Sequence, residues 1–237
     1  MKPITTLSIL ALSCLSANAS YTITKDATGE EIKFGLEALT TWRSEYNYRG
    51  FQLADQSLEF QIAGQVALSD TQTIDIGIYH GSATGDGDFK ETAAYIDFSK
   101  NIGDLTYTAK LAFKDFSDSI FDSGVDIGGS VNWVYNDTID FTALLTYDTG
   151  AEGFYGEIKA SAYKGLSLDS YLTFDIGLGI TADYYDRSGL HQYFAKLSYT
   201  YNINESVSVS PYVGTSLGID DEAQDSLYSG FYFAVSF

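Results

Sequence analysis

The sequence has two histidines, and one of them, His80, is followed two positions later by Ser82. Residues two apart share one face of a strand, so this pair could act as general base and nucleophile on a lipid ester. Asp86, Asp88 or Glu91 could then orient the histidine. A triad is defined by geometry rather than by spacing, and a Gly-Ser loop start after a boundary histidine is common. We therefore expect no catalytic residues, and a lipid hydrolase or deacylase using His80 and Ser82 stays an alternative.

Arginine is rare in this chain, and two of its three arginines, Arg43 and Arg49, are close in sequence. They could face acidic side chains across a pore and filter solutes. Charges inside a narrow barrel must also be paired, so an internal ion-pair network that holds strand register is the favoured interpretation. The candidates for the pore lining and its constriction are Glu37, Arg43, Glu45, Arg49, Glu59, Asp75, Tyr79, Lys110, Asp126 and Asp175.

Acidic loops could bind Ca²⁺ or Mg²⁺ through their carboxylates. Asp86-Gly87-Asp88 and Asp220-Asp221-Glu222 have suitable residue types, but neither completes a calcium-binding loop. The sequence also contains no phosphate-binding loop, zinc-ligand spacing or dinucleotide fingerprint. We therefore expect solvated acidic loops, with neither a metal nor an organic cofactor.

The secondary structure that positions these residues is built from a chain of unusual composition. The 237 residues carry 13 Lys+Arg against 32 Asp+Glu, a net charge of −19, and include 19 Tyr, 15 Phe, 22 Gly and only 2 Pro. Such an acidic chain lacks the basic face that phosphate backbones require, so nucleic acid is excluded as a partner. The high aromatic content excludes a disordered chain, and the scarcity of proline favours uninterrupted strands.

The first 19 residues have the pattern of a secretory signal peptide. Lys2 supplies the positive start, Ile4–Leu15 is mostly apolar, and Ala17-Asn18-Ala19 is a cleavage motif. Cleavage after Ala19 would remove Cys14, the only cysteine, so the mature chain would have no disulfide; lipidation of Cys14 is the less favoured alternative. The expected organisation is a signal peptide over 1–19, a short periplasmic lead over 20–31 and an outer-membrane β-barrel over 32–237.

Apolar and polar residues alternate along most of the chain. From Leu58 to Leu68 a period of two continues for eleven residues, longer than the five or six of a typical globular strand. A secreted β-sandwich would also alternate, but these lengths favour a closed antiparallel up-and-down transmembrane β-barrel. About twelve strands are expected, near 34–46, 57–68, 73–80, 90–99, 105–114, 124–135, 138–147, 153–163, 169–184, 191–201, 207–217 and 226–237. Short turns alternate with longer acidic loops at 81–88, 115–122, 148–153, 186–189 and 218–225.

The apolar face suits lipid better than a protein core. Tyr and Trp lie near strand ends on this parity, as expected for rings at a bilayer boundary: Trp42, Tyr107, Trp133, Tyr135, Tyr147, Tyr184, Tyr199 and Tyr201. We also expect His191 at this interface. The chain ends in the alternation Phe231, Phe233, Val235, Phe237. A terminal strand of this kind resembles the membrane-assembly signal of bacterial outer-membrane proteins, with Phe233, Val235 and Phe237 as its residues.

The polar face predicts a narrow lumen. With a strand spacing of about 4.7 Å and a tilt of about 40°, twelve strands give a backbone radius of roughly 12 Å. Seven inward tyrosines are expected to protrude into this space, namely Tyr79, Tyr155, Tyr163, Tyr171, Tyr212, Tyr228 and Tyr232. The inward positions carry more acids than bases, so cations or neutral molecules are the expected solutes.

The segment Trp42-Arg43-Ser44-Glu45-Tyr46-Asn47-Tyr48-Arg49-Gly50-Phe51-Gln52, followed by the strand Leu58–Leu68, resembles the opening of the TorF-type porin family, also called Gcw_chp. Members share an S-x-Y-x-aromatic-R-G pattern, a signal peptide and acidic, Tyr-rich strands. The match is clearest over residues 36–80. The resemblance implies a pore-like outer-membrane protein and brings no catalytic residues with it.

These observations predict a bacterial outer-membrane channel through which small neutral or cationic solutes diffuse. The first alternative is a non-conducting structural or adhesive barrel with acidic surface loops, and the second is the lipid hydrolase described above. The expected partners are outer-membrane lipids and lipopolysaccharide, the barrel-assembly machinery acting on the C-terminal strand, and small solutes.

Overall fold

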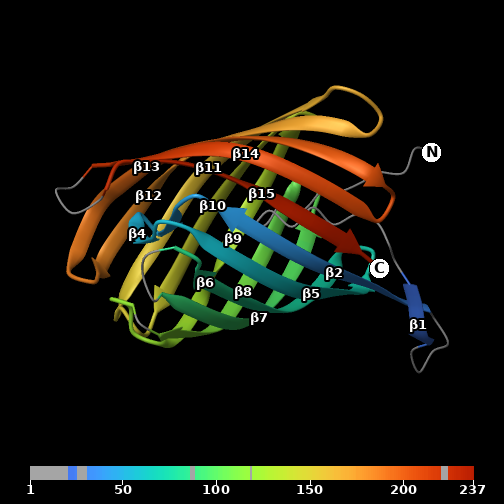
Figure 1. The fold of residues 1–237 in the computed structure, drawn as a ribbon. Coiled ribbons are helices and arrows are strands. Elements are labelled where there is room, and N and C mark those ends of the chain that lie inside the picture. Colours follow the sequence, from blue (N-terminus) through green and yellow to red (C-terminus); the bar gives the residue numbers. More distant parts are fainter. Residues whose placement is uncertain (1–20, 26–30, 86–88, 118, 220–223) are drawn as a thin grey trace.

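Twelve strands close into one antiparallel barrel in the computed structural model, which describes residues 21–25, 31–85, 89–117, 119–219 and 224–237 (Figure 1). Consecutive strands are neighbours, and β2 closes the barrel by pairing with both β5 and β15. The strands are β2 (Glu31–Arg43), β5 (Ser57–Ser69), β6 (Gln72–Ala83), β7 (Lys90–Ile102), β8 (Leu105–Ser117), β9 (Gly124–Asn136), β10 (Ile139–Asp148), β11 (Gly153–Gly165), β12 (Ser170–Tyr184), β13 (Arg187–Asn204), β14 (Val207–Gly218) and β15 (Ser226–Ser236). The predicted up-and-down barrel is confirmed.

A further strand, β1 (Tyr21–Lys25), pairs with the start of β2. It lies in the segment 20–31 that the sequence indicated as a lead into the barrel. The expected signal peptide, residues 1–19, lies outside the described residues.

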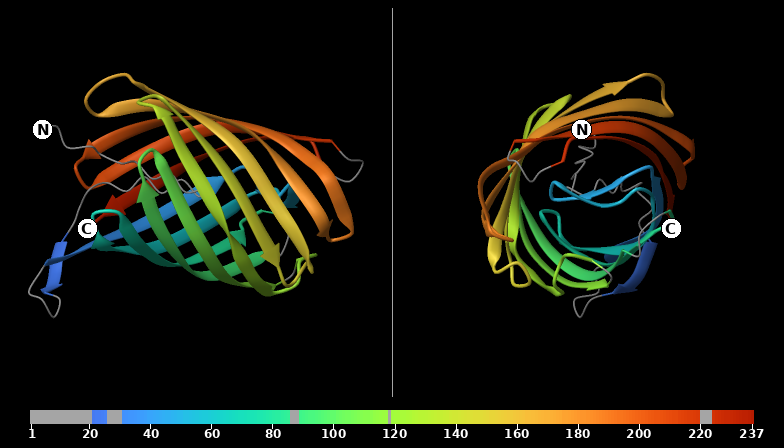
Figure 2. Two further views of the ribbon diagram at one scale, coloured as in Figure 1. Left: turned by 180° about the vertical axis from the view of Figure 1, so that it is seen from behind. Right: turned by 60° about the vertical axis from the view of Figure 1, so that its left-hand side comes forward.

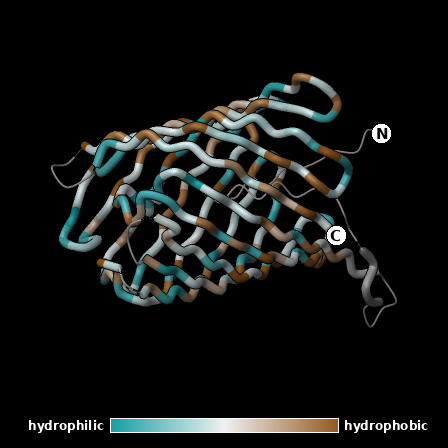
Figure 3. The backbone as a smooth tube through the Cα atoms, in the orientation of Figure 1, coloured by the Kyte–Doolittle hydropathy of each residue, from teal (hydrophilic) through white to brown (hydrophobic). Residues whose placement is uncertain are grey.

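The barrel wall is apolar outside and polar inside, the reverse of a soluble core. Hydrophilic and hydrophobic residues alternate along the strands in Figure 3. Ile62 and Ile78, directly paired on β5 and β6, are 49% and 58% exposed, whereas Glu59 and Asp97 are 3% and 2% exposed. This inversion follows from the period of two, which sends neighbouring side chains to opposite faces. Among the described residues, no helix is long and apolar enough to cross a membrane.

The C-terminal strand completes the closure. Residues of β15 pair with β2 from Gly230↔Arg43 to Ser236↔Glu37. Phe237 then donates its backbone N–H to the Leu36 carbonyl at 2.8 Å. The terminal alternation therefore closes the hydrogen-bond ladder and leaves no free edge.

The two ends of the barrel differ. At one, which we call the turn end, two-residue connections join β5–β6, β7–β8, β9–β10 and β13–β14. Most connections at the opposite, loop end are longer. The expected loop at 186–189 is wrong, because β12 and β13 continue to a two-residue connection, Tyr185-Asp186, with φ of 48° and 64°. Two consecutive positive φ values suit a tight hairpin turn of type I′.

A short hairpin between β2 and β5 lies inside the barrel (Figure 2, light blue in the right-hand view). It consists of β3 (Tyr46–Tyr48) and β4 (Phe51–Ala54), joined by Arg49 and Gly50 with φ of 49° and 84°. The sequence had suggested that the first barrel strand continues to residue 46. It ends at Arg43 because the following residues pair with one another.

Candidate functional site

The tip of the β3–β4 hairpin carries Arg49, which is held by the barrel wall. Its Nη1 donates to Asp148 Oδ2 at 3.1 Å and to the Tyr184 hydroxyl at 2.8 Å. Its Nη2 forms an ion pair with Asp126 and donates to Thr146 Oγ1 at 3.4 Å. The guanidinium also lies 4.9 Å from the ring centroid of Tyr155. A charge buried this deeply is stable only when it is paired and hydrogen-bonded in this way.

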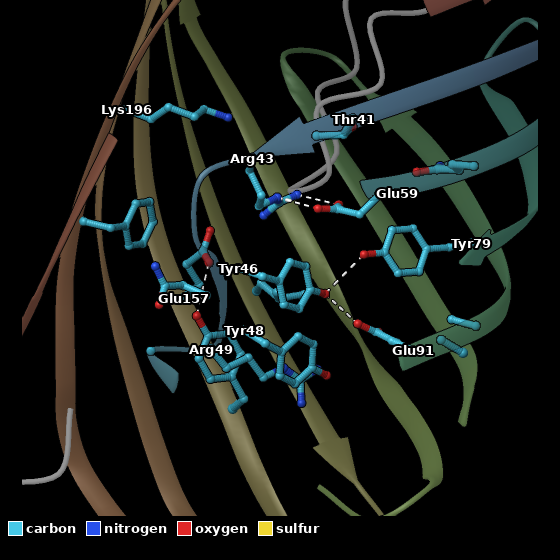
Figure 4. Close-up of a pocket in the computed structure, with 18 of the residues that line it drawn as sticks. Thr41, Arg43, Tyr46, Tyr48, Arg49, Glu59, Tyr79, Glu91, Glu157 and Lys196 are labelled. Carbon is cyan, nitrogen blue, oxygen red and sulfur yellow. Dashed lines mark hydrogen bonds and ion pairs between the residues drawn. The ribbon is translucent and has the colours of Figure 1, made fainter. Parts of the chain in front are cut away.

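The first arm of the hairpin reaches the opposite wall. Tyr46 donates to Glu91 Oε2 at 2.5 Å and accepts from the Tyr79 hydroxyl at 3.2 Å (Figure 4). Burial, with a further contribution from the nearby Glu91, raises the pKa of Tyr46 well above its ordinary value. The phenol therefore stays protonated and remains a donor. Tyr48 contacts Lys114, which also forms an ion pair with Asp126.

Aromatic side chains seal the hairpin into the loop end. Phe51 packs edge-on against Phe121 at 5.0 Å between ring centroids, and Phe121 packs against Tyr185 at 4.8 Å. Arg187 lies over the Phe51 ring at 3.8 Å. On the other arm, Tyr46 stacks on Phe89 at 4.9 Å. Both hydrophobic clusters of the described chain therefore form around hairpin residues, where the hairpin packs against the barrel.

Two residues expected at the membrane boundary are buried inside. His191 is fully buried, and its Nε2 lies 2.9 Å from the Arg49 carbonyl oxygen. The ladder between β12 and β13 shifts register at this point, so the bulged residue turns inward. Tyr184 is also fully buried. A second register shift lies between Thr181 and Tyr184, where Asp183 has a φ of 53°. This shift reverses the inward and outward alternation of side chains just before Tyr184.

A cavity of about 410 Å³ lies within the barrel beside the hairpin. Eight of the ten predicted pore-lining residues are part of its wall: Arg43, Glu45, Arg49, Glu59, Tyr79, Lys110, Asp126 and Asp175. The other two lie elsewhere. Glu37 is a buried residue of β2, and Asp75 on β6 accepts a hydrogen bond from Gln65 Nε2 at 2.7 Å.

Sequence reasoning missed several residues that hold the hairpin, among them Lys114, Thr146, Asp148, Tyr184 and His191. A local signal for the hairpin itself was present. The run Tyr48-Arg49-Gly50-Phe51 places a residue-glycine pair between aromatic residues, which is typical of a two-residue hairpin turn.

The cavity lining is nearly balanced in charge. Its acidic residues are Glu45, Glu59, Glu91, Asp97, Asp126, Glu157 and Asp175, and its basic residues are Arg43, Arg49, Lys110, Lys114, Lys159 and Lys196. Five of these six bases form ion pairs, with Arg43 bound to Glu59 at 2.5 Å. Because Asp126 pairs with two bases, carboxylates are left over. In the part of the chain that the structure describes, Glu45, Glu91 and Glu157 form no ion pair.

Several inward tyrosines lie against the wall instead of protruding, contrary to expectation. A Cβ added at Gly214 would lie 2.5 Å from Tyr228 Cζ, and one at Gly230 would lie 2.5 Å from the Tyr212 hydroxyl oxygen. The glycine thus leaves room for the ring of the neighbouring strand. Tyr212 also stacks on Tyr232 at 4.7 Å between centroids. The rings therefore occupy less of the lumen than the sequence indicated.

Among the described residues of the alternative lipid hydrolase, no hydrogen bond joins His80 to Ser82 or to Glu91. His80 is exposed on the outer face, where its Nδ1 lies 3.0 Å from Thr92 Oγ1. Glu91 points inward to Tyr46 and cannot orient this histidine. Asp86 and Asp88 lie outside the described residues, as does the acidic run 220–222. No group of three or more potential metal ligands occurs among the residues that the structure describes.

No family model and no curated protein matches the chain. Solved structures do. The chain is similar to KdgM porin, with a TM-score of 0.57 and 7% identity over 86% of this chain and 99% of that one. It is similar to NanC porin, with a TM-score of 0.55 and 9% identity over 85% and 98%. It is also similar to the COG4313 outer membrane channel from Pseudomonas putida F1, with a TM-score of 0.54 and 8% identity over 87% and 94%. The chain therefore has the barrel fold that these porins and this channel share.

Proposed function

We propose that this protein is a porin-like channel of a bacterial outer membrane, through which small neutral or cationic solutes diffuse. The observation that carries the proposal is a cavity lined by many charged and polar side chains and enclosed by a wall whose outer face is apolar. Water would penalise such an outer face, whereas lipid hydrocarbon suits it. A closed barrel also satisfies every backbone group of the wall, as a membrane requires.

The C-terminal strand supports this location. Phe233, Val235 and Phe237 follow the terminal alternation, and Phe233 and Phe237 are 40% and 49% exposed. In this proposal they form the signal by which the assembly machinery recognises the strand. The outer apolar face then contacts membrane lipids.

The preference for cations rests on the carboxylates that remain after internal pairing. Glu45, Glu91 and Glu157 line the cavity and accept hydrogen bonds from neutral donors, Glu157 from the Tyr155 hydroxyl at 3.2 Å. Of the basic residues that line the cavity, Lys159 is the one that forms no ion pair in the described chain. Unneutralised carboxylates in a narrow lumen attract cations and repel anions.

The β3–β4 hairpin is the constriction of this channel. It is formed by the segment that resembles the TorF-type porin family, and its pattern now has a physical basis. Tyr46 anchors one wall, Arg49 anchors the other, and Gly50 lets the tip pass His191. We infer membership of that family from this segment.

Planar-bilayer recordings test the proposal. The register pair Arg43↔Ser57 ends the β2–β5 ladder, so residues 45–56 can be replaced by a short Gly-Asn turn without changing the barrel strands. The native barrel should give small conductance steps and the shortened barrel larger ones. If neither conducts, the protein is the non-conducting structural or adhesive barrel that the filled loop end also suits.

A further inference from the structure

The barrel wall around Arg49 is a complete binding site built without the hairpin backbone. Four strands supply it: Asp126 from β9, Thr146 and Asp148 from β10, Tyr155 from β11 and Tyr184 from β12. All five side chains are buried, Tyr184 fully. Two carboxylates, a phenol and a threonine hydroxyl therefore converge on one guanidinium.

The arrangement suits a planar guanidinium rather than a compact ammonium. The two Nη atoms diverge to different carboxylates, Nη1 to Asp148 Oδ2 at 3.1 Å and Nη2 to Asp126. The guanidinium carbon lies 4.9 Å from the ring centroid of Tyr155 and 5.3 Å from that of Tyr184. Guanidinium combines a rigid planar fork of N–H donors with a flat face that stacks on aromatic rings, whereas an ammonium ion has neither the fork nor the flat face.

The site is held in place by contacts that do not involve Arg49. Tyr184 donates its hydroxyl to Asp148 Oδ2 at 3.1 Å, and Asp148 Oδ1 accepts from the Gly150 backbone N–H at 2.9 Å. Asp126 is also paired with Lys114. Removal of the arginine would therefore leave oriented acceptors rather than a collapsed wall.

The site is also within reach of the lumen. Asp126, Thr146 and Tyr155 all line the cavity, as does Arg49 itself. The occupant is a side chain on a short hairpin whose chain ends are fixed at Arg43 and Ser57. A tethered group of this kind can exchange with a free molecule of the same chemistry.

We propose that this part of the wall is a guanidinium-binding site, that Arg49 is its tethered occupant, and that the channel selects solutes bearing a guanidinium group. Such a solute displaces Arg49, and the hairpin tip leaves the wall as it passes. The selection of solutes rests on the proposed channel function, whereas the binding site does not.

Binding is tested with Arg49→Ala in detergent micelles, using ethylguanidinium and ethylammonium as probes in ligand-observed NMR titrations. The vacated site should bind ethylguanidinium at least roughly tenfold more tightly than ethylammonium, as expected for charge-assisted hydrogen bonds in a preformed fork. Asp148→Asn in the Arg49→Ala background should abolish that preference. Equal binding of the two probes, or a preference that survives Asp148→Asn, would overturn the proposal.

Lys110→Ala is the matched control, since it vacates a cation position beside Asp97 on the other side of the cavity. It should show no preference for guanidinium. Heat-modifiable migration on a gel reports whether each variant is folded. If Arg49→Ala does not fold, the barrel with residues 45–56 replaced by a short turn vacates the same site and gives the same comparison.

Conductance separates the two proposals. In planar bilayers, Arg49→Ala should conduct more than the native barrel, and millimolar ethylguanidinium should reduce its conductance while ethylammonium should not. Guanidinium binding without conductance in any variant would remove the channel function and leave the site. Conductance without guanidinium preference would remove the site and leave the channel.

Discussion

Glu59 and Glu157 are glutamates on the same inner face, but their surroundings differ. Glu59 accepts a hydrogen bond from Arg43 Nη2 at 2.6 Å and forms an ion pair with Arg43 Nε at 2.5 Å, so its charge is compensated inside the wall. Glu157 accepts from the Tyr155 hydroxyl, which carries no charge. At the scale of the residue, a count of charged side chains on the inner face therefore does not define the electrostatic potential of the lumen. That potential also depends on whether each charge is paired with an opposite charge.

Replacement of Glu59 by Gln should lower cation selectivity, because Arg43 then presents an uncompensated positive charge to the cavity. Glu45→Gln should act in the same direction, since it removes one of the cavity-lining carboxylates that the ion pairs leave over. Reversal potentials under a KCl gradient measure both. Asp137→Asn is the control, because Asp137 lies in the exposed β9–β10 connection. It removes one negative charge outside the lumen and should leave the reversal potential unchanged. Equal potentials for all variants would show that these carboxylates do not act on permeating ions.

At the scale of the element, the β3–β4 hairpin is the part of the barrel that depends most on one backbone conformation. Gly50 has a φ of 84°, and a Cβ added there would lie 2.6 Å from His191 Cδ2. The same glycine therefore meets two demands: a left-handed backbone and close approach to an imidazole ring. Gly103, in the β7–β8 connection, has a φ of 62° and no atom within 4 Å of an added Cβ.

The two glycines form a matched pair for substitution. Gly103→Ala should cost about 1 kcal/mol through backbone strain alone. Gly50→Ala adds a clash with His191, so the tip should move away from the wall and the conductance should rise. Urea unfolding in micelles and single-channel recordings measure the two effects. If the two variants behave alike in both assays, the contact with His191 does not position the hairpin.

At the scale of the whole molecule, the barrel is stabilised by two different environments. The inner face buries paired charges, and the outer face exposes isoleucine, leucine or phenylalanine on each barrel strand from β5 to β15. The barrel is thus one sheet whose outer face suits lipid hydrocarbon and whose inner face suits water. Only a membrane with water inside the barrel supplies both.

Ile78→Lys tests the outer face, because Ile78 lies in the middle of β6 and is 58% exposed. A lysine near the bilayer midplane should destabilise the folded barrel by roughly 2–4 kcal/mol. Leu168→Lys is the control, since Leu168 lies in the β11–β12 connection and is fully exposed. Folding into lipid vesicles over a urea series gives both free energies. A small loss for Ile78→Lys would place this face in water.

The sequence by itself indicated about twelve barrel strands and the faces of nearly all their residues, because alternation with a period of two is a local property. It could not place Tyr184 or His191, since two bulges reverse the alternation where β12 meets β13. It also could not show that the segment from Tyr46 to Ala54 turns inward. That outcome depends on partners up to 179 positions away, such as Ser226 beside Asn47. Tertiary structure alone brings Asp126, Asp148 and Tyr184 around Arg49, because only closure of the barrel places β9, β10 and β12 around a loop that follows β2.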